Sequence, residues 1–146
     1  MTDFLIRSAT EDDFPSVLPL FRQLWPDKQI DEAALAKVFY RGITSDADEL
    51  LCAVVNGAVV GFCAYAIVNN FWQEGSIAYI YAMVVDECHR GEGCGTQLIR
   101  ASMETARRYG LKRIELDSGF PRLQAHSFYE KLGFEKRAYL FSYRLS

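Results

Sequence analysis

The chain has 146 residues, of which 50% are hydrophobic and 14% aromatic. This length suits one domain with a full core and is too short for two ordinary domains, so we expect a single domain over residues 1–146. The net charge is -3, from 16 basic and 19 acidic residues with no block of Lys or Arg. That balance excludes the basic footprint of a nucleic-acid-binding protein.

The cysteines and histidines are too few and too scattered for a metal centre. No C-x-x-C pair occurs, and His89 and His126 are the only imidazoles, so we expect neither a zinc site nor a disulfide framework. Cys52 and Cys63 lie in apolar runs and are predicted core residues. The N-terminus has no signal-peptide pattern, and no run of 18 apolar residues occurs, which predicts a soluble, cytoplasmic protein without a membrane partner.

The first half of the chain predicts one strand, two helices and a β-hairpin. The strand covers residues 4–8, and Thr10, with Asp13 three residues on, is the expected N-cap of a helix to about Trp25. Asp31 is the expected cap of the second helix. Asn56-Gly57 is a strong hairpin signal between strands over residues 49–55 and 58–68. Their nearly continuous apolar runs indicate that both faces of the sheet are covered.

The second half predicts a strand, a helix and a strand, followed by a helix and a final strand or hairpin. The expected ranges are 77–85, 96–109, 112–117, a helix around 125–132, and 134–145. Alternation in the first of these strands places Tyr79, Tyr81, Met83 and Val85 on one face. Gly110 is the expected C′ glycine of the helix over 96–109, and the strands on either side of that helix form a parallel, right-handed crossover.

A glycine-rich turn joins the strand 77–85 to the helix that follows it. Its sequence is Arg90-Gly91-Glu92-Gly93-Cys94-Gly95-Thr96. Glycines at this spacing let several backbone N–H groups converge on one anion at a helix N-terminus, so a phosphate is the expected guest. The order is neither a G-x-G-x-x-G fingerprint nor a Walker loop with Gly-Lys-Ser/Thr.

Two segments together resemble the GNAT family of N-acetyltransferases. Residues 90–95 match its R/Q-x-x-G-x-G/A signature, and Ala125–Phe134 is similar to its A-x-x-x-Y-E-K-L-G-F segment. The resemblance implies an α/β (α+β) fold. In that fold a mixed, mostly antiparallel sheet carries helices on both faces and contains a parallel central strand pair.

The resemblance also implies acetyl-CoA as co-substrate. Its pyrophosphate would bind the N–H groups of residues 91–96, and Arg90 would add a charge-assisted bond. Glu92 would have to point away from this anion. The pantetheine arm would pair with the backbone of Met83, Val84 and Val85, beside a bulge that family members typically carry there. The complete set of cofactor-binding candidates is Met83, Val84, Val85, Arg90, Gly91, Glu92, Gly93, Cys94, Gly95, Thr96 and Arg122.

Two of these candidates have particular features. Arg122 stands where many family members have an asparagine that hydrogen-bonds the cofactor, so the usual amide contact is lost. Cys94 lies at a helix start, where its pKa can be lowered, yet compact packing is its expected task.

The family position predicts Tyr129 as the general acid that protonates the departing thiolate. The stripe of Ala125, Phe128, Tyr129 and Leu132 equally suits a core position. The general base is left open among Glu74, which is preferred, Tyr81 and Asp117. His126 is expected to be a partly exposed helix residue.

The expected acceptor is a primary amine of a small molecule or peptide. Its pocket would be built from the first two helices, the Trp25-Pro26-Asp27 connection and the Phe71-Trp72 loop. Two alternatives stay open, namely a longer acyl-CoA donor and a non-catalytic module that binds acetyl-CoA as a sensor. Family members are often dimers, so the resemblance allows a homodimer, although no segment here specifies an interface.

Overall fold

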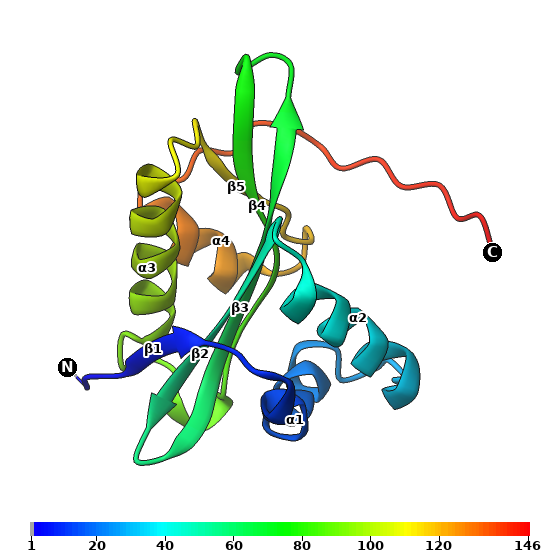
Figure 1. The fold of residues 1–146 in the computed structure, drawn as a ribbon, viewed down its shortest axis with the longest axis vertical. Helices are drawn as coiled ribbons and strands as arrows, with labels where there is room; N and C mark the ends of the chain where they lie inside the picture. The colour runs from blue at the N-terminus through cyan, green and yellow to red at the C-terminus, as the bar shows by residue number, and fades with distance from the viewer. Residues whose placement is uncertain (1) are drawn as a thin grey trace. The chain divides into compact units, whose positions relative to one another are not determined.

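The computed structural model describes residues 2–146 (Figure 1). The chain divides into two compact units, the first ending at Glu115 and the second covering Leu116–Ser146. The elements, in chain order, are β1 (Leu5–Ser8), the 3-10 turn η1 (Glu11–Asp13), α1 (Phe14–Leu24), α2 (Glu32–Thr44), β2 (Asp48–Val55), β3 (Ala58–Asn70), β4 (Gly75–Val85), the 3-10 turn η2 (Glu87–His89), α3 (Cys94–Arg108), β5 (Ile114–Leu116) and α4 (Leu123–Lys131). Among the described residues, no helix is long and apolar enough to cross a membrane.

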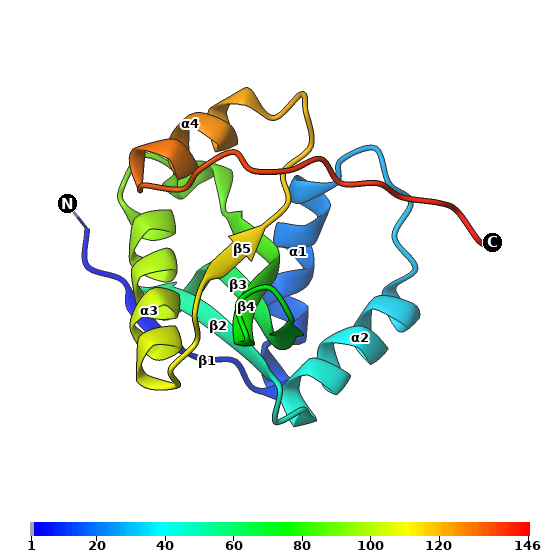
Figure 2. The same ribbon diagram turned by 90° about the horizontal axis from the view of Figure 1, so that it is seen from above.

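The sheet has the strand order β1-β2-β3-β4-β5. β1 to β4 pair antiparallel in succession, and β5 lies parallel to β4. Helices α1 and α2 cover one face of the sheet, and α3 covers the other (Figure 2). The predicted mixed α/β architecture is therefore confirmed.

The predicted caps and turns form as expected. Thr10 and Asp13 make a reciprocal capping box at the start of η1, and the Asp31 carboxylate accepts from the Ala34 N–H at 3.0 Å. Asn56 and Gly57 both have positive φ, 51° and 78°, which matches the twist of a tight hairpin. These short-range signals act within a few residues, so they are legible without tertiary contacts.

The core lies on both faces of β2 and β3. Successive residues Cys52 and Ala53 are fully buried, as are Phe62 and Cys63, which confirms that both faces are covered. Toward α1 and α2, Phe62 joins a cluster of aromatic and aliphatic side chains from these helices. Cys63 points to the opposite face, where its sulfur lies 3.7 Å from the Ser102 hydroxyl of α3.

A one-residue bulge interrupts β4 at Tyr81. Ala82 pairs with Ala64 of β3, but the next pair joins Ile80 to Tyr65, so Tyr81 has no counterpart on β3. Such an extra residue shifts the alternation of side chains between the two faces and can re-aim one of them.

The bulge separates Tyr81 from Met83 and Val85. Met83 lies opposite Cys63, on the α3 face, because directly paired residues share a face. The Tyr81 hydroxyl instead donates to Asp48 of β2 on the α2 face, at 2.5 Å. The expectation that Tyr81, Met83 and Val85 share one face is therefore wrong, since strict alternation does not survive an inserted residue.

The second unit, Leu116–Ser146, contains α4 and an extended C-terminal segment. The predicted strand or hairpin over 134–145 is wrong, because these residues form no strand and their apolar side chains are exposed, with Phe141 at 92% and Leu145 at 93%. A strand needs a neighbouring strand for its backbone groups, and local alternation does not provide that partner.

Asp13 anchors the first helix by an ion pair, which gives a testable dependence on pH. Its carboxylate accepts from both terminal nitrogens of Arg7, at 2.7 and 2.8 Å. These bonds from Arg7, with help from the Thr10 N–H, lower the pKa of Asp13 to about 2. Because the folded-state pKa lies below the unfolded value of about 3.9, the stabilisation is complete above that value and is lost as the pH falls toward about 2.

We therefore expect Asp13→Asn to lower the free energy of unfolding by about 1–2 kcal/mol at pH 7. Urea unfolding at several pH values checks this, and the gap between variant and wild type should narrow from pH 5 to pH 3. A gap of constant size across that range would show that the ion pair is not its cause.

Candidate functional site

The glycine-rich turn after β4 adopts the backbone that its sequence predicts. Gly91 and Gly93 have φ of 79° and 89°, in the left-handed region that favours glycine. Gly93 is the N-cap of α3, and no side chain of residues 2–146 is found capping this helix end. The chain thus passes from strand to helix through two positions where any other residue would be strained.

The N-terminus of α3 presents free backbone donors. The first bond within the helix runs from the Gln97 N–H to the Gly93 carbonyl, at 3.0 Å. The N–H groups of Cys94, Gly95 and Thr96 precede that bond, so helix geometry gives them no acceptor within α3. Together with the positive end of the helix dipole, they form a site suited to an anion.

A polar network ties the start of the turn to α1. The Gln23 side chain donates to the Asp86 carboxylate at 2.7 Å and accepts from the Glu87 N–H at 2.9 Å. Asp86 also contacts the imidazole of His89 at 2.9 Å. Gln23, then His89, lower the pKa of Asp86, which favours its charged form. No local sequence pattern marks this anchor, because Gln23 is distant in sequence from the turn.

The charged residues of the turn have separate partners. Arg90 is exposed, and its Nε donates to the Val85 carbonyl at 3.2 Å. Glu92 accepts from the Thr2 hydroxyl at 3.1 Å, so its carboxylate is held by the N-terminal segment. Because both charged side chains have these partners, the anion site of the turn is assigned to the backbone N–H groups at the start of α3.

Cys94 is a packing residue in this structure. It is buried, and burial, followed by the charge of Glu92, raises its pKa to about 11. The suggestion of a lowered pKa is therefore wrong, because burial outweighs the helix terminus. A Cβ atom built on Gly61 of β3 would lie 2.8 Å from the Cys94 sulfur, so the absence of a side chain at Gly61 lets α3 seat against the sheet.

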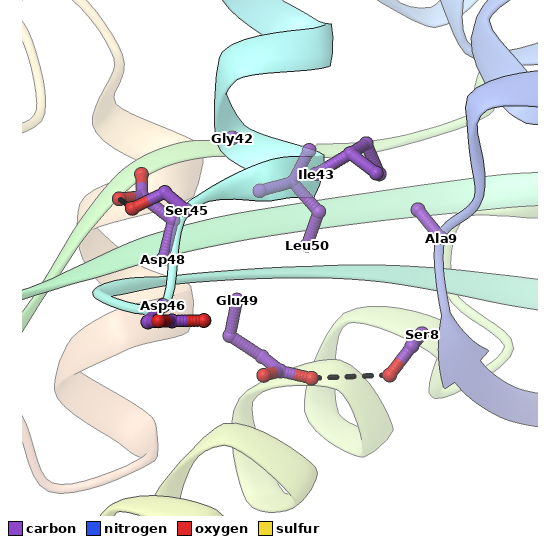
Figure 3. A pocket seen from close by; sticks show the side chains of 9 residues that line it. All are labelled: Ser8, Ala9, Gly42, Ile43, Ser45, Asp46, Asp48, Glu49 and Leu50. Carbon is purple, nitrogen blue, oxygen red and sulfur yellow. Dashed lines mark hydrogen bonds between the residues drawn. The ribbon is translucent and has the colours of Figure 1, made fainter.

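Two neighbouring hollows lie between the C-terminal end of α2 and the sheet, on the face opposite α3. The larger, of about 470 Å³, is lined in part by Tyr81, Asp48 and Arg41. The smaller, of about 280 Å³, shares Asp48 and Ser45 and extends to β1 (Figure 3). Ser45 donates to Asp48 at 2.9 Å, and Ser8 donates to Glu49 at 3.1 Å.

The pairing of Tyr81 with Asp48 was not predicted. Antiparallel register places Asp48 opposite Ala66, and the bulge turns Tyr81 toward the same face. Burial, followed by the hydrogen bond to Asp48, raises the pKa of Tyr81, so this hydroxyl keeps its proton near neutral pH. The hairpin signal aligns β2 with β3, but no local pattern marks the position of the bulge.

The other acceptor-side candidates lie elsewhere in the first unit. Glu74 is exposed, with φ of 54°, in the turn that joins β3 to β4. Along an extended strand it is about 20 Å from Tyr81. Phe71 and Trp72, in the same turn, are 99% and 80% exposed, and Trp25 stacks on Phe21. None of these residues lines either hollow. Of the segments predicted to build the acceptor pocket, only α2 lines the two hollows.

The remaining site candidates belong to the second unit. Tyr129 of α4 is 8% exposed, and its ring packs against Phe128 and Phe134 at centroid distances of 5.2 and 5.6 Å. Arg122 is the exposed N-cap of α4, and His126 is partly exposed and contacts the Gly119 carbonyl at 2.9 Å. Asp117 is also exposed. The roles of Tyr129 and Arg122 stay predictions.

Among residues 2–146, no group of three His, Cys, Asp or Glu side chains is placed to hold a metal ion.

Comparison with known proteins agrees with this geometry. A family model described as the acetyltransferase (GNAT) family matches residues 8–134, and the chain belongs to that family. The relatives described next are N-acetyltransferases, which are acyltransferases. The family assignment confirms the resemblance inferred from the glycine turn and the Ala125–Phe134 segment.

Two relatives show how far the similarity extends. An uncharacterised N-acetyltransferase of Methanocaldococcus jannaschii is 31% identical over 140 residues, which cover 92% of this chain and 62% of that relative. The chain thus spans less than two thirds of that protein's length. An aminoalkylphosphonate N-acetyltransferase of Salmonella typhimurium is 29% identical over 137 residues, 94% of this chain and 88% of that protein.

Among solved structures, a protein of Agrobacterium tumefaciens assigned as an acetyltransferase superposes with a TM-score of 0.84 at 28% identity. The match covers 96% of this chain and 99% of that one.

The contact between Gly61 and Cys94 gives a test of how α3 is seated. We expect Gly61→Ala to destabilise the protein by about 1–3 kcal/mol, because the added methyl group overlaps the Cys94 sulfur. Urea unfolding of Gly61→Ala, Cys94→Ala and the double variant measures the coupling. The double variant should lose less stability than the sum of the single variants, whereas strict additivity would show that the two residues do not compete for this space.

Proposed function

We propose that this protein transfers the acetyl group of acetyl-CoA to a primary amine of a small molecule. The observation that carries the proposal is the uncapped N-terminus of α3, which follows a bulged strand through two left-handed glycines. GNAT acetyltransferases use acetyl-CoA as co-substrate. A relative named for its action on aminoalkylphosphonates supports a small amine as acceptor.

The residues of the turn fit a diphosphate. A Cβ atom built on Gly91 meets no atom within 4 Å, so the space beside the backbone is open. The N–H groups at the start of α3 would bind the diphosphate, and Arg90 would add a positive charge. Met83, Val84 and Val85 lead into the turn, and a pantetheine arm would pair with their backbone as an added strand.

The reaction needs two proton transfers, which differ in their free-energy cost. An alkyl amine with a pKa of about 10.4 is neutral in about one molecule in 2,500 at pH 7, a penalty of roughly 4.6 kcal/mol. Removal of that proton is the larger task. The departing thiolate, with a reference pKa of about 8.5, is assisted by an acid, and the hydroxyl of Tyr129, with a reference value of about 10, is our candidate.

Donor binding is tested by a matched pair of glycine variants. Gly91 and Gly110 both have positive φ, 79° and 70°, and a Cβ on either meets no atom within 4 Å. Alanine at either position strains the backbone by a similar amount, about 1–2 kcal/mol. In calorimetric titration with CoA, we expect Gly91→Ala to weaken binding about tenfold or more, and Gly110→Ala to bind as the wild type does. Equal affinities for both variants would place the diphosphate elsewhere.

The role of Tyr129 is tested by removal of its hydroxyl. We expect Tyr129→Phe to lower kcat by about 10²-fold or more, with CoA affinity retained, because a general acid contributes 10²–10⁴-fold. Thiol release from acetyl-CoA measures the rate, and Tyr139→Phe, at a 73% exposed position, is the control. Unchanged turnover in Tyr129→Phe would make Tyr129 a packing residue. A wild type that binds CoA but acetylates no amine would instead be a sensor.

A further inference from the structure

The larger hollow, beside the β4 bulge, is lined by a carboxylate, a phenol hydroxyl and a guanidinium group. Tyr81 lines it from β4, Asp48 from β2 and Arg41 from α2, and these three are its only charged or titratable lining groups. Tyr81 is 40% exposed, so a ligand in the hollow can reach part of this residue. Gly42 also lines the hollow, and a Cβ atom built there would lie 3.4 Å from the Tyr81 hydroxyl oxygen. The absence of a side chain at Gly42 therefore leaves space beside that oxygen.

The hydrogen bond between Tyr81 and Asp48 decides what the hydroxyl can do next. A phenol has one O–H proton, and Tyr81 directs it toward the Asp48 carboxylate in a hydrogen bond. The oxygen then offers only lone pairs to a further ligand, so it accepts from an N–H donor. Ser45 donates to the other oxygen of Asp48, which holds the carboxylate in place.

Arg41 supplies the opposite charge. It takes part in none of the ion pairs found between described side chains, and it is exposed at the rim of the same hollow. A guanidinium binds phosphonate or carboxylate groups through paired N–H donors. A ligand that carries an amine and an anion on a short chain would match both sides of the hollow.

We propose that this hollow receives the acceptor as a small zwitterion, with its amine at Tyr81 and Asp48 and its anionic group at Arg41. The inference rests on the proposed function and deepens it by naming the class of acceptor and the group that takes its proton. Tyr81 is the catalytic residue in this scheme, and Asp48 acts through it.

The proton balance is simple. The ammonium gives one proton to the Tyr81 oxygen as the original Tyr81 proton passes to Asp48, which leaves a neutral amine and a protonated carboxyl group. The amine nitrogen then bonds to the thioester carbonyl carbon, and the carbon–sulfur bond breaks. The second amine proton ends on the CoA sulfur, and Asp48 returns its proton to solvent.

Position along β4 supports this assignment over Glu74. Tyr81 lies about 13 Å along the strand from Val85, where the donor-binding turn begins, whereas Glu74 is at the other end of β4. A donor arm that runs along the strand from the turn would therefore approach Tyr81 first.

The test uses 2-aminoethylphosphonate and propylamine, which share an amine on a short chain and differ in the anionic group. Thiol release is measured at saturating acetyl-CoA for the wild type, Tyr81→Phe, Asp48→Asn and Arg41→Gln. Asp46→Asn and Tyr40→Phe are the controls, because Asp46 and Tyr40 do not line the larger hollow and Tyr40 is 41% exposed, like Tyr81.

At pH 7 we expect Tyr81→Phe and Asp48→Asn to lower kcat by about 10²-fold, and both controls to match the wild type. The loss should shrink toward pH 9.5, because an amine with a pKa of about 10.4 then loses its proton without help. A merely structural role would not produce that recovery. Arg41→Gln should raise KM about tenfold for 2-aminoethylphosphonate and leave KM for propylamine unchanged.

The outcomes separate this inference from the proposed function. Wild-type rates in Tyr81→Phe and Asp48→Asn, or an equal loss at every pH, would overturn the proton transfer. A wild type that acetylates kanamycin but neither short amine would overturn the zwitterion site and keep the acetyltransferase. A wild type inactive with all three amines, though it binds CoA, would contradict the proposed function itself.

Discussion

The inserted residue at Tyr81 is the constraint on which both halves of the site depend. Because side chains in a strand alternate between faces, one additional residue reverses the pattern on either side of it. Met83 and Val85 thereby face α3, while Tyr81 turns to the opposite face and meets Asp48. One strand thus leads to the glycine-rich turn at its end, which we propose binds the donor, and presents a polar hydroxyl to the hollow beside α2.

Packing of α3 determines whether the proposed donor site can form. Its first turn is seated by Cys94 against Gly61, and the preceding turn is tied to α1 through Gln23 and Asp86. These contacts hold a helix end whose N–H groups lack side-chain caps. Such an end is unfavourable when buried without partners and well suited to an anion, so the rigid surroundings preserve a binding site that local stability alone would not favour.

The sequence predicted well those features that depend on neighbouring residues. The capping box at Thr10, the hairpin at Asn56-Gly57 and the glycine turn before α3 each arise from backbone preferences within a few positions. Features that depend on a distant partner were harder to predict. Alternation over residues 134–145 predicted a strand that does not form, and the position of Cys94 at a helix start suggested a lowered pKa, whereas burial raises it.

The amino-acid sequence by itself therefore determined the family, the order of elements as far as α4 and the backbone of the glycine-rich turn, because spacing of glycines and caps sets local φ, ψ and donor directions. Only the tertiary structure decided where β4 takes its additional residue, which carboxylate meets Tyr81 and how α2 borders the hollow. Those outcomes depend on register between strands and on packing across a sheet, and such long-range choices leave no periodic signal in one segment.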